Sequence, residues 1–334
     1  MTLVDEELSR NWTDRLGSFG KKQQKKLLSG IGSYASVYEL NEQLVASSVD
    51  GVGTKLLWAL DLDSHYDSIA QDLIAMNVND LLCVGARPQL FFDYIACGNK
   101  NDLNPGQRLD VFIKAVFDIC QKESLILAGG ETAQMADLYP QGHFDLAGMA
   151  IGFMPHSEWL DPKLIDPTKK YEIWGLKSSG PHSNGFTRLR SLFNVKNDRN
   201  FIDQNLMAPT CIYTKKVFEL KDTLKNKADI KAMFHNTGSG LDNLLRINSV
   251  LDESIGFEIK HWPDQGPWIY ELKKRSELSD LELFREFNMG IGFMLMIESS
   301  DQNKQVLEKQ QWTLLGETTK QAQTIKTPWF EYKL

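Results

Sequence analysis

Short apolar runs and longer helical stripes alternate along the chain. In the first half, four runs predict strands, at 44–49, 91–96, 124–128 and 146–154. Between the first two, residues 68–82 place Ile69, Leu73 and Met76 on one stripe, which predicts a helix with a buried face. Asn104-Pro105 has the residues of a helix start, and the apolar positions from Leu109 onward give that helix its own buried face.

A second alternating series follows a segment rich in proline, aspartate and lysine at 155–168. Its predicted strands lie at 171–176, 230–234 and 292–297, and its predicted helices at 186–193 and 241–247. Strands and helices alternate in both halves, which predicts an α/β or mixed α+β class. We therefore expect two domains, at 1–155 and 156–334. The length of 334 residues agrees, because a domain usually takes about 150 residues.

Composition narrows the class of protein. The formal net charge of −7 disfavours a general nucleic-acid binder, which would be basic, yet permits a locally positive pocket for an anionic small molecule. The four cysteines are scattered without a C-x-x-C pair, as in a reduced cytoplasmic protein. Apolar stretches of about ten residues are too short to span a membrane. The basic run at 21–26 is interpreted as a solvated helix face, with a cationic arm reaching a phosphate as the alternative.

The first candidate for chemistry is the loop at 48–55, which follows a predicted strand. It combines Asp50, Gly51, Gly53, Thr54 and Lys55. Glycine lets backbone N–H groups approach a ligand, an aspartate can hold Mg²⁺, and a lysine can neutralise phosphate. The alternative is a tight turn with an exposed lysine, because the pattern differs from the P-loop motif.

The second candidate is the polar strip of the helix at 68–82. Asp72 and Asn79 lie about 20° apart around the helix, and Asp80 lies about 80° from Asp72. Buried aspartates are costly unless they are paired or bind a metal. With Asp50 they predict a carboxylate cluster for Mg²⁺, and the alternative is a partly exposed helix with surface acids.

Three further small-residue loops have the same character, at 128–133, 178–185 and 235–240. The first carries Glu131 and Thr132, and the other two each place a histidine, His182 or His235, ahead of a helix that favours anions at its N-terminus. A capping glutamate and two structural histidines are the alternatives. Together the loops favour a phosphate-rich ligand, Mg²⁺ and phosphoryl transfer, in which the protein mainly positions groups and stabilises charge.

Several motifs, in order and over nearly the whole chain, resemble the phosphoribosylformylglycinamidine cyclo-ligase (AIR synthetase) family. They are DGVGTK (50–55), QDLIAMNVND (71–80), GARPQLFFDYIACG (85–98), GGETAQM (129–135), DLAG (145–148), SSGPHSNGF (178–186), LMAPTCIY (206–213), HNTGSG (235–240) and FREFNMGIG (284–292). The resemblance implies ATP-dependent ring closure in purine biosynthesis. Formylglycinamidine ribonucleotide is phosphorylated on its formyl oxygen, a substrate nitrogen attacks, and aminoimidazole ribonucleotide, ADP and phosphate leave. It also implies Mg²⁺, a potassium requirement, and a cytoplasmic homodimer whose N-terminal domains form an interface β-barrel with the ATP site nearby.

The resemblance also implies roles by motif position. His235, Lys55 and Asp80 would act in catalysis, His235 by contacting substrate phosphate or assisting proton transfer. The metal ligands would be Asp50, Asp72 and Asp80. The nucleotide would be bound by Asp50, Gly51, Gly53, Thr54, Lys55, Glu131 and Thr132. The substrate would be bound by His182, Ser183, Asn184, Thr237 and Gly238.

The chain departs from the family at two loops. A loop of the type G-G-x-G-G-F-G reads Ser29-Gly30-Ile31-Gly32-Ser33-Tyr34-Ala35 here, and H-x-T-G-G-G reads HNTGSG. A Y-x-x-A-G-V-D-I segment is not recognisable before Lys21. Each replaced glycine gains a Cβ and loses easy access to positive φ. A non-catalytic nucleotide-binding paralogue therefore stays an alternative, as does another ATP-using enzyme of the superfamily, such as thiamine-phosphate kinase. Selenophosphate synthetase is disfavoured because no cysteine precedes Cys83.

Overall fold

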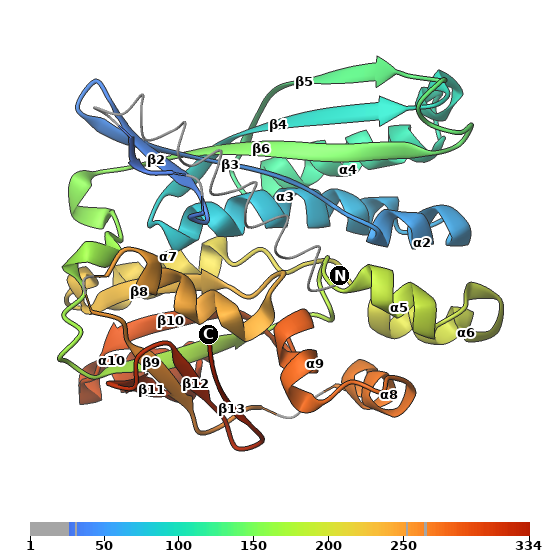
Figure 1. Cartoon of the computed structure of the whole chain (residues 1–334). Coiled ribbons are helices and arrows are strands. Elements are labelled where there is room, and N and C mark those ends of the chain that lie inside the picture. Colours follow the sequence, from blue (N-terminus) through green and yellow to red (C-terminus); the bar gives the residue numbers. More distant parts are fainter. Residues whose placement is uncertain (1–26, 31, 252, 264–265) are drawn as a thin grey trace.

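A computed structural model of the chain describes residues 27–30, 32–251, 253–263 and 266–334. Over these ranges the chain forms two mixed sheets with helices packed between and around them, which confirms the predicted two-part α/β class (Figure 1). No helix in these ranges has the length and apolar character needed to cross a membrane. The basic run at 21–26 and the missing N-terminal motif lie outside the described residues.

The first sheet has the strand order β1-β2-β3-β6-β4-β5. Its strands are β1 (Leu27–Ser29), β2 (Ser36–Leu40), β3 (Gln43–Gly51), β4 (Arg87–Cys97), β5 (Ile126–Gln134) and β6 (Phe144–Met154). Neighbours are antiparallel except β4 and β5. The helices in the described part of this half are α2 (Lys55–Leu62), α3 (Tyr66–Cys83), α4 (Arg108–Lys122) and the 3-10 turn η1 (Lys100–Leu103). The helices α3 and α4 cover one face of the sheet, and the other face carries no layer formed by the described residues (Figure 1).

The second sheet has the order β13-β12-β9-β11-β7-β10-β8. Its strands are β7 (Tyr171–Lys177), β8 (Ile230–His235), β9 (Gly256–Ile259), β10 (Ile291–Glu298), β11 (Thr313–Thr319), β12 (Thr324–Lys326) and β13 (Glu331–Lys333). The α-helices are α5 (Phe186–Leu192), α6 (Val195–Phe201), α7 (Thr214–Thr223), α8 (Pro267–Arg275), α9 (Asp280–Glu286) and α10 (Asp301–Lys309). Shorter helical segments are η2 (His156–Glu158), η3 (Pro162–Leu164), η4 (Ile202–Leu206), η5 (Lys227–Asp229) and η6 (Gly240–Ser249).

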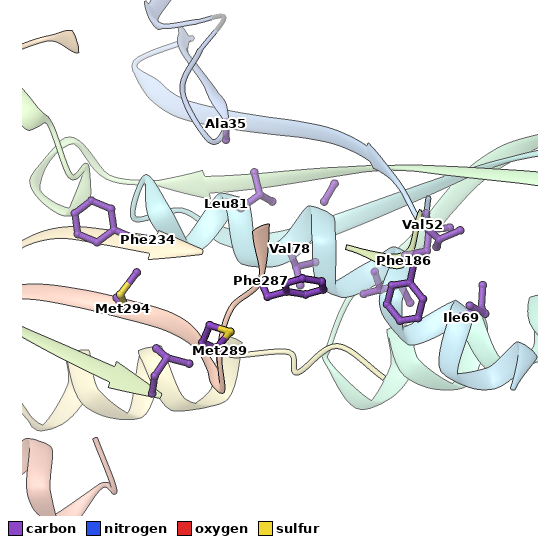
Figure 2. Packing of buried hydrophobic residues seen from close by; sticks show 14 of the residues in the cluster. Ala35, Val52, Ile69, Val78, Leu81, Phe186, Phe234, Phe287, Met289 and Met294 are labelled. Carbon is purple, nitrogen blue, oxygen red and sulfur yellow. The ribbon is translucent and has the colours of Figure 1, made fainter. Parts of the chain in front are cut away.

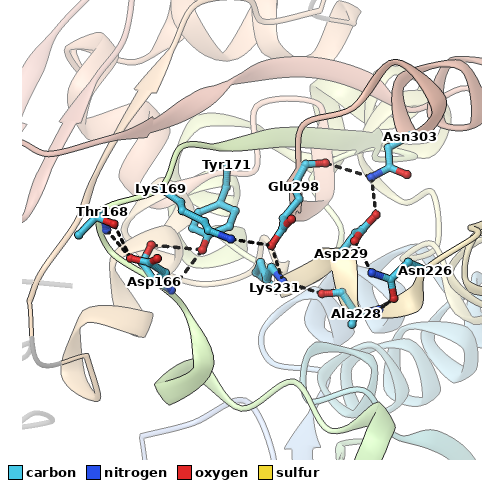
Figure 3. A network of polar contacts seen from close by, with 10 residues as sticks. All are labelled: Asp166, Thr168, Lys169, Tyr171, Asn226, Ala228, Asp229, Lys231, Glu298 and Asn303. Carbon is cyan, nitrogen blue, oxygen red and sulfur yellow. Dashed lines mark hydrogen bonds and ion pairs between the residues drawn. The ribbon is translucent and has the colours of Figure 1, made fainter.

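The connection between the sheets runs from β6 to β7 and contains the predicted boundary at 155/156. A polar network fastens its end to the second sheet (Figure 3). Lys169, near the start of β7, and Lys231, on β8, both pair with Glu298 at the end of β10, at 3.6 and 2.8 Å. The connection is therefore tied to the strands that it precedes.

Buried side chains from both halves pack in one cluster around α3 (Figure 2). Val78 and Leu81 come from α3 and Phe234 from β8. Phe186 is the first residue of α5, and Phe287 directly follows α9. All five have almost no exposed surface, and burying each such side chain contributes about 1.5–3 kcal/mol. The helix α3 thus belongs to the cores of both sheets, and its polar strip lies where the two halves meet.

The predicted helix at 68–82 and the predicted strands are confirmed, whereas three local details differ. The helix expected at Asn104-Pro105 begins at Arg108, because Gly106 has φ +78° and ends any helical run before it. The predicted loop at Gly129-Gly130 is the middle of β5, where Gly130 has no Cβ to collide with Asp93 on β4. The helix expected at 241–247 is the 3-10 helix η6.

Candidate active site

The polar strip of α3 binds the segment that precedes α7. Asp72 Oδ1 accepts hydrogen bonds from the Thr210 amide at 2.7 Å and the Thr210 hydroxyl at 2.6 Å. About two helical turns further on, the Asn79 side-chain amide donates to the Cys211 carbonyl at 2.8 Å and accepts from the Tyr213 backbone amide at 3.0 Å. The strip predicted from helical spacing is therefore buried, and its first use is to join the two halves.

Lys55 and Asp72 form a fully buried ion pair. The Lys55 ammonium lies 2.8 Å from Asp72 Oδ2 and donates to the Ala208 carbonyl at 2.8 Å, and neither side chain is exposed. Burial lowers the pKa of Lys55, and the charge of Asp72 opposes that shift. Both Asp72 oxygens are occupied, one by Thr210 and one by Lys55. The pair is thus engaged within the protein, and neither member is placed to meet a phosphate or a metal in this conformation.

The predicted cluster of Asp50, Asp72 and Asp80 is not formed. Within the described part of the chain, no group of three or more His, Cys, Asp or Glu side chains is arranged to hold a metal ion. Asp72 is not available to a metal because it forms an ion pair with Lys55. The sequence could not reveal this pair, because the two residues lie on different helices.

Asp50, Asp80 and His235 do come together, at the end of β3, on α3 and at the end of β8. His235 Nδ1 lies 2.9 Å from Asp80 Oδ1, and Asn79 Nδ2 lies 3.3 Å from His235 Nε2. These partners assign the proton to Nδ1, because the carboxylate accepts there and the Asn79 amide donates to Nε2. Since His235 is fully buried and Asp80 is 17% exposed, Asp80 is the member that can reach a ligand. His235 holds it in place.

Asp50 lies beside this pair with its Oδ1 accepting from the Gly51 amide at 2.7 Å. Burial raises the pKa of Asp50, and the neighbouring charge of Asp80 raises it further. Two carboxylates held close together in a partly buried site repel each other, so a divalent cation between them would relieve the repulsion.

Three of the predicted loops converge beside these carboxylates. Gly53 has φ +65°, and a Cβ there would lie 3.9 Å from the Ser183 carbonyl. A Cβ on Gly238 would lie 3.4 Å from Asn184 Oδ1. The Asn184 Nδ2 group is buried and has no partner among the described residues, which leaves a donor directed at this junction. The junction therefore offers small residues and a free donor, as an anion site requires.

His182 is buried behind that junction. Its Nε2 accepts weakly from the Cys211 amide at 3.5 Å, and its Nδ1 has no partner in the described part of the structure. Burial lowers the pKa of His182 well below its usual value, and the charges of His235 and Lys55 lower it further. The ring is therefore neutral, while the neighbouring Ser183 hydroxyl is occupied by the Thr210 hydroxyl at 3.0 Å.

Glu131 and Thr132 do not join this cluster within one chain. The register aligns Asp50 with Gly148, Asp93 and Gly130 across four strands, a distance of about 14 Å at the usual strand spacing. Glu131 is the next residue along β5, so its side chain points to the opposite face of the sheet from the Asp50 row. Both residues are exposed on the edge strand.

The altered N-terminal loop retains its essential glycine geometry. Gly32 has φ +99°, whereas Ser33 and Ala35 do not lie in the left-handed region, so the added Cβ atoms are tolerated there. Ser239, the other departure, does adopt φ +74°, a conformation that favours glycine. The predicted site residues did not include Thr210, whose only sequence signal is a polar residue in an apolar surrounding, and the polar strip included Asn79 without a role for it.

Comparisons with known proteins cover most of the chain. Residues 32–154 match the family described as AIR synthase related protein, N-terminal domain, and residues 172–326 match its C-terminal domain. A phosphoribosylformylglycinamidine cyclo-ligase of Cupriavidus metallidurans is 36% identical over 316 residues, covering 91% of this chain and 87% of that protein. The one of Finegoldia magna is 36% identical over 306 residues, covering 86% and 85%.

Solved structures share the fold at much lower identity. Thiamine-monophosphate kinase from Stenotrophomonas maltophilia has a TM-score of 0.61 at 16% identity and covers 95% of both chains. The E. coli hydrogenase maturation protein HypE has a TM-score of 0.61 at 13% identity, covering 87% of this chain and 85% of its own. At this level the likeness shows the fold alone.

Proposed function

The chain belongs to the AIR synthase related family, and we propose that it catalyses the ATP-dependent closure of formylglycinamidine ribonucleotide to aminoimidazole ribonucleotide, with release of ADP and phosphate. The observation that carries the proposal is the paired carboxylates Asp50 and Asp80 beside three converging small-residue loops. Relatives named as the cyclo-ligase share about a third of the sequence over most of the chain. The thiamine and hydrogenase-maturation proteins share far less.

Mg²⁺ fits the two carboxylates without a third. Mg²⁺ keeps several waters and is usually held by one or two carboxylates together with substrate phosphates, rather than by a cage of protein ligands. Asp50 and Asp80 are the residues that would hold it, and the ion would neutralise charge on the transferred phosphoryl group. Asp72 is left out because Lys55 and Thr210 occupy it.

The protein's own contribution is positioning. The His235 ring fixes the Asp80 carboxylate through Nδ1, and Asn79 fixes the ring. Asn184 Nδ2, Thr237 and Gly238 offer donors and open space to phosphate oxygens. The γ-phosphoryl group of ATP is transferred to the formyl oxygen of the substrate. A substrate nitrogen then attacks the formyl carbon, and the former formyl oxygen leaves as part of the phosphate. Lys55 and His182 contact the segment at 208–211 and hold it in place beside the site, without touching the ligands themselves.

A homodimer would complete the site. The uncovered face of the first sheet carries Val49, Tyr94 and Ile126, which are 69%, 41% and 62% exposed. Glu131 lies on that same face. Pairing of two such faces would bury the apolar residues and bring Glu131 of one copy toward the nucleotide of the other.

The turnover assay is the central test. Purified protein with formylglycinamidine ribonucleotide, ATP and Mg²⁺ should release ADP and aminoimidazole ribonucleotide, and both products should require all three components. Asp80→Asn should lose at least a hundredfold in kcat, whereas Asp61→Asn, an exposed aspartate on α2, should not change it. The same assay in sodium and potassium buffers tests the potassium requirement. Full turnover by the Asp80 variant would overturn the metal assignment.

Two further outcomes separate the alternatives. Tight ADP binding by calorimetry without any turnover would favour a nucleotide-binding paralogue, as the strained Ser239 and the altered glycine loop would allow. For the dimer, Asp50→Asn and Glu131→Gln proteins would each be inactive but would regain about a quarter of the activity when mixed and reassembled. No recovery would show that both residues serve one chain's own site, or that Glu131 serves none.

A further inference from the structure

The hydroxyl of Tyr34 is a buried donor without a partner among the described residues. Tyr34 lies in the altered glycine loop just before β2, and its ring packs against the buried cluster around α3. A buried hydroxyl that makes no hydrogen bond is unfavourable, so this group is available to an atom from outside the described residues, a water or a ligand. The related family pattern has phenylalanine at this position, so the hydroxyl is a feature of this chain.

Arg246 covers the same ring. Its guanidinium lies 4.8 Å from the centre of the Tyr34 ring, and it projects from η6, which follows directly after the loop at 235–240. Arg246 is exposed, and in the described ranges no carboxylate lies within ion-pair distance of it. Stacking on an aromatic ring orients the planar guanidinium and leaves its fork of N–H donors available for an oxyanion.

Both groups border the carboxylate site. Burial raises the pKa of the Tyr34 hydroxyl, Arg246 opposes that shift, and the charge of Asp80 adds to it. Burial likewise raises the pKa of the Cys83 thiol at the end of α3, and Arg246 opposes that shift. A cation and a neutral donor therefore lie next to each other near the acidic pair.

We propose that Tyr34 and Arg246 form a phosphate-binding edge of the active site, in which the guanidinium and the hydroxyl both donate to oxygens of one phosphate group. The inference rests on the proposed function only in taking Asp80 as part of the same site. The phosphate belongs either to the nucleotide or to the ribonucleotide substrate, because the recognising chemistry is the same for both.

The test compares Tyr34→Phe, Arg246→Gln and the double variant. Tyr34→Phe removes one oxygen and keeps the ring on which Arg246 stacks. We expect about tenfold weaker binding for Tyr34→Phe and about ten- to a hundredfold for Arg246→Gln, the range for hydrogen bonds to a charged group. The double variant should lose less than the product of the two, because both donors act on one group. Tyr38→Phe on β2 and Lys309→Gln on α10 are the matched controls and should bind as the parent does.

Two measurements keep the test decisive. Calorimetry with ADP and with inorganic phosphate reports binding directly, even if the parent protein shows no turnover, and so separates this inference from the proposed function. In steady-state assays, a rise in KM for ATP alone identifies the nucleotide phosphate, and a rise in KM for the ribonucleotide alone identifies the substrate phosphate. Unchanged affinity for every ligand in both single variants would overturn the proposal.

Discussion

At the scale of single residues, the Lys55–Asp72 pair changes the meaning of a motif. The sequence DGVGTK suggests a lysine that meets phosphate, yet the ammonium is buried between Asp72 and the Ala208 carbonyl. Lys55, which the motif suggests is a phosphate ligand, therefore joins the two halves of the protein through its bond to Ala208. The distinction can be measured, because a structural lysine and a phosphate ligand affect stability differently.

We predict that Lys55→Met destabilises the ligand-free protein by about 3–5 kcal/mol, because Asp72 is left as an uncompensated buried charge. The double variant Lys55→Met with Asp72→Asn should recover much of that loss. Urea unfolding without nucleotide measures both. An unchanged unfolding free energy for Lys55→Met would show that the lysine serves ligand binding alone, and Lys309→Gln on the surface provides the comparison for removing a charge.

His182 predicts a pH dependence of stability. Its pKa is held well below 6.5 in the folded state by burial, whereas an unfolded histidine titrates near 6.5. Below about pH 6.5 the unfolded chain binds a proton that the folded chain refuses, so the unfolding free energy falls as the pH falls. The contribution is fully present above pH 6.5 and is lost at up to about 1.4 kcal/mol per pH unit below it.

Unfolding free energies between pH 5 and 8 check this for the parent and for His182→Gln. The variant should show a smaller loss on acidification, whatever its stability at neutral pH. His261→Gln, an exposed histidine, should keep the parental slope. Identical slopes for the parent and the His182 variant would contradict a neutral buried ring.

At the scale of elements, the sequence predicted the helices and strands better than their partners. The α3 pattern, with Ile69 and Leu73 on one stripe, followed from local periodicity and was confirmed. The strand at Gly129-Gly130 was missed because glycine pairs usually mark loops. Glycine is needed at position 130 because a Cβ there would collide with Asp93 on the neighbouring strand. The partner of Asp72 was missed for the same reason, since a contact between distant segments leaves no local pattern.

The family match ends at residue 326, with strand β12, and leaves out the second strand of the C-terminal hairpin. Beyond it, β13 pairs with β12, and Trp329 stacks on Phe284 of α9 at 5.2 Å between ring centres. The Tyr332 hydroxyl donates to Asp242 in the first turn of η6, and Arg285 donates to the same carboxylate at 2.8 Å. The hairpin thus fixes the helix that follows the loop at 235–240.

We predict that Tyr332→Phe lowers the unfolding free energy by about 1.5–3 kcal/mol, the usual contribution of a hydrogen bond to a charged group. Thermal and urea unfolding measure the loss. Tyr38→Phe removes a hydroxyl from the other half and should cost less than 0.5 kcal/mol, as is usual for surface changes. If both variants lost the same unfolding free energy, the hydrogen bond from Tyr332 to Asp242 would not contribute to stability, and Arg285 alone would satisfy that carboxylate.

At the scale of the whole molecule, α3 organises the chain by serving two cores at once. Its apolar residues pack under the first sheet, while its polar strip binds the second half and presents Asp80 to the site. Among the described residues, the first sheet is covered by helices on one face only (Figure 1). Exposed apolar residues on that face are typical of an interaction surface, and a second copy of the chain offers the same surface.

We therefore predict that Val49→Asp converts a dimer into a monomer. Val49 is 69% exposed and aligns with Met149 and Phe92 across the uncovered face, so a carboxylate there would be buried unpaired in a dimer. Sedimentation or light scattering at micromolar concentration should show the mass halved, and turnover should fall with it if Glu131 acts across the interface. Leu164→Asp, at a residue 78% exposed in the connection between the sheets, should change neither. A parent protein that is already monomeric would contradict the dimer, and a Val49→Asp protein that stays dimeric would show that the two copies meet at another surface. Either result would remove the proposed role of Glu131 across the interface.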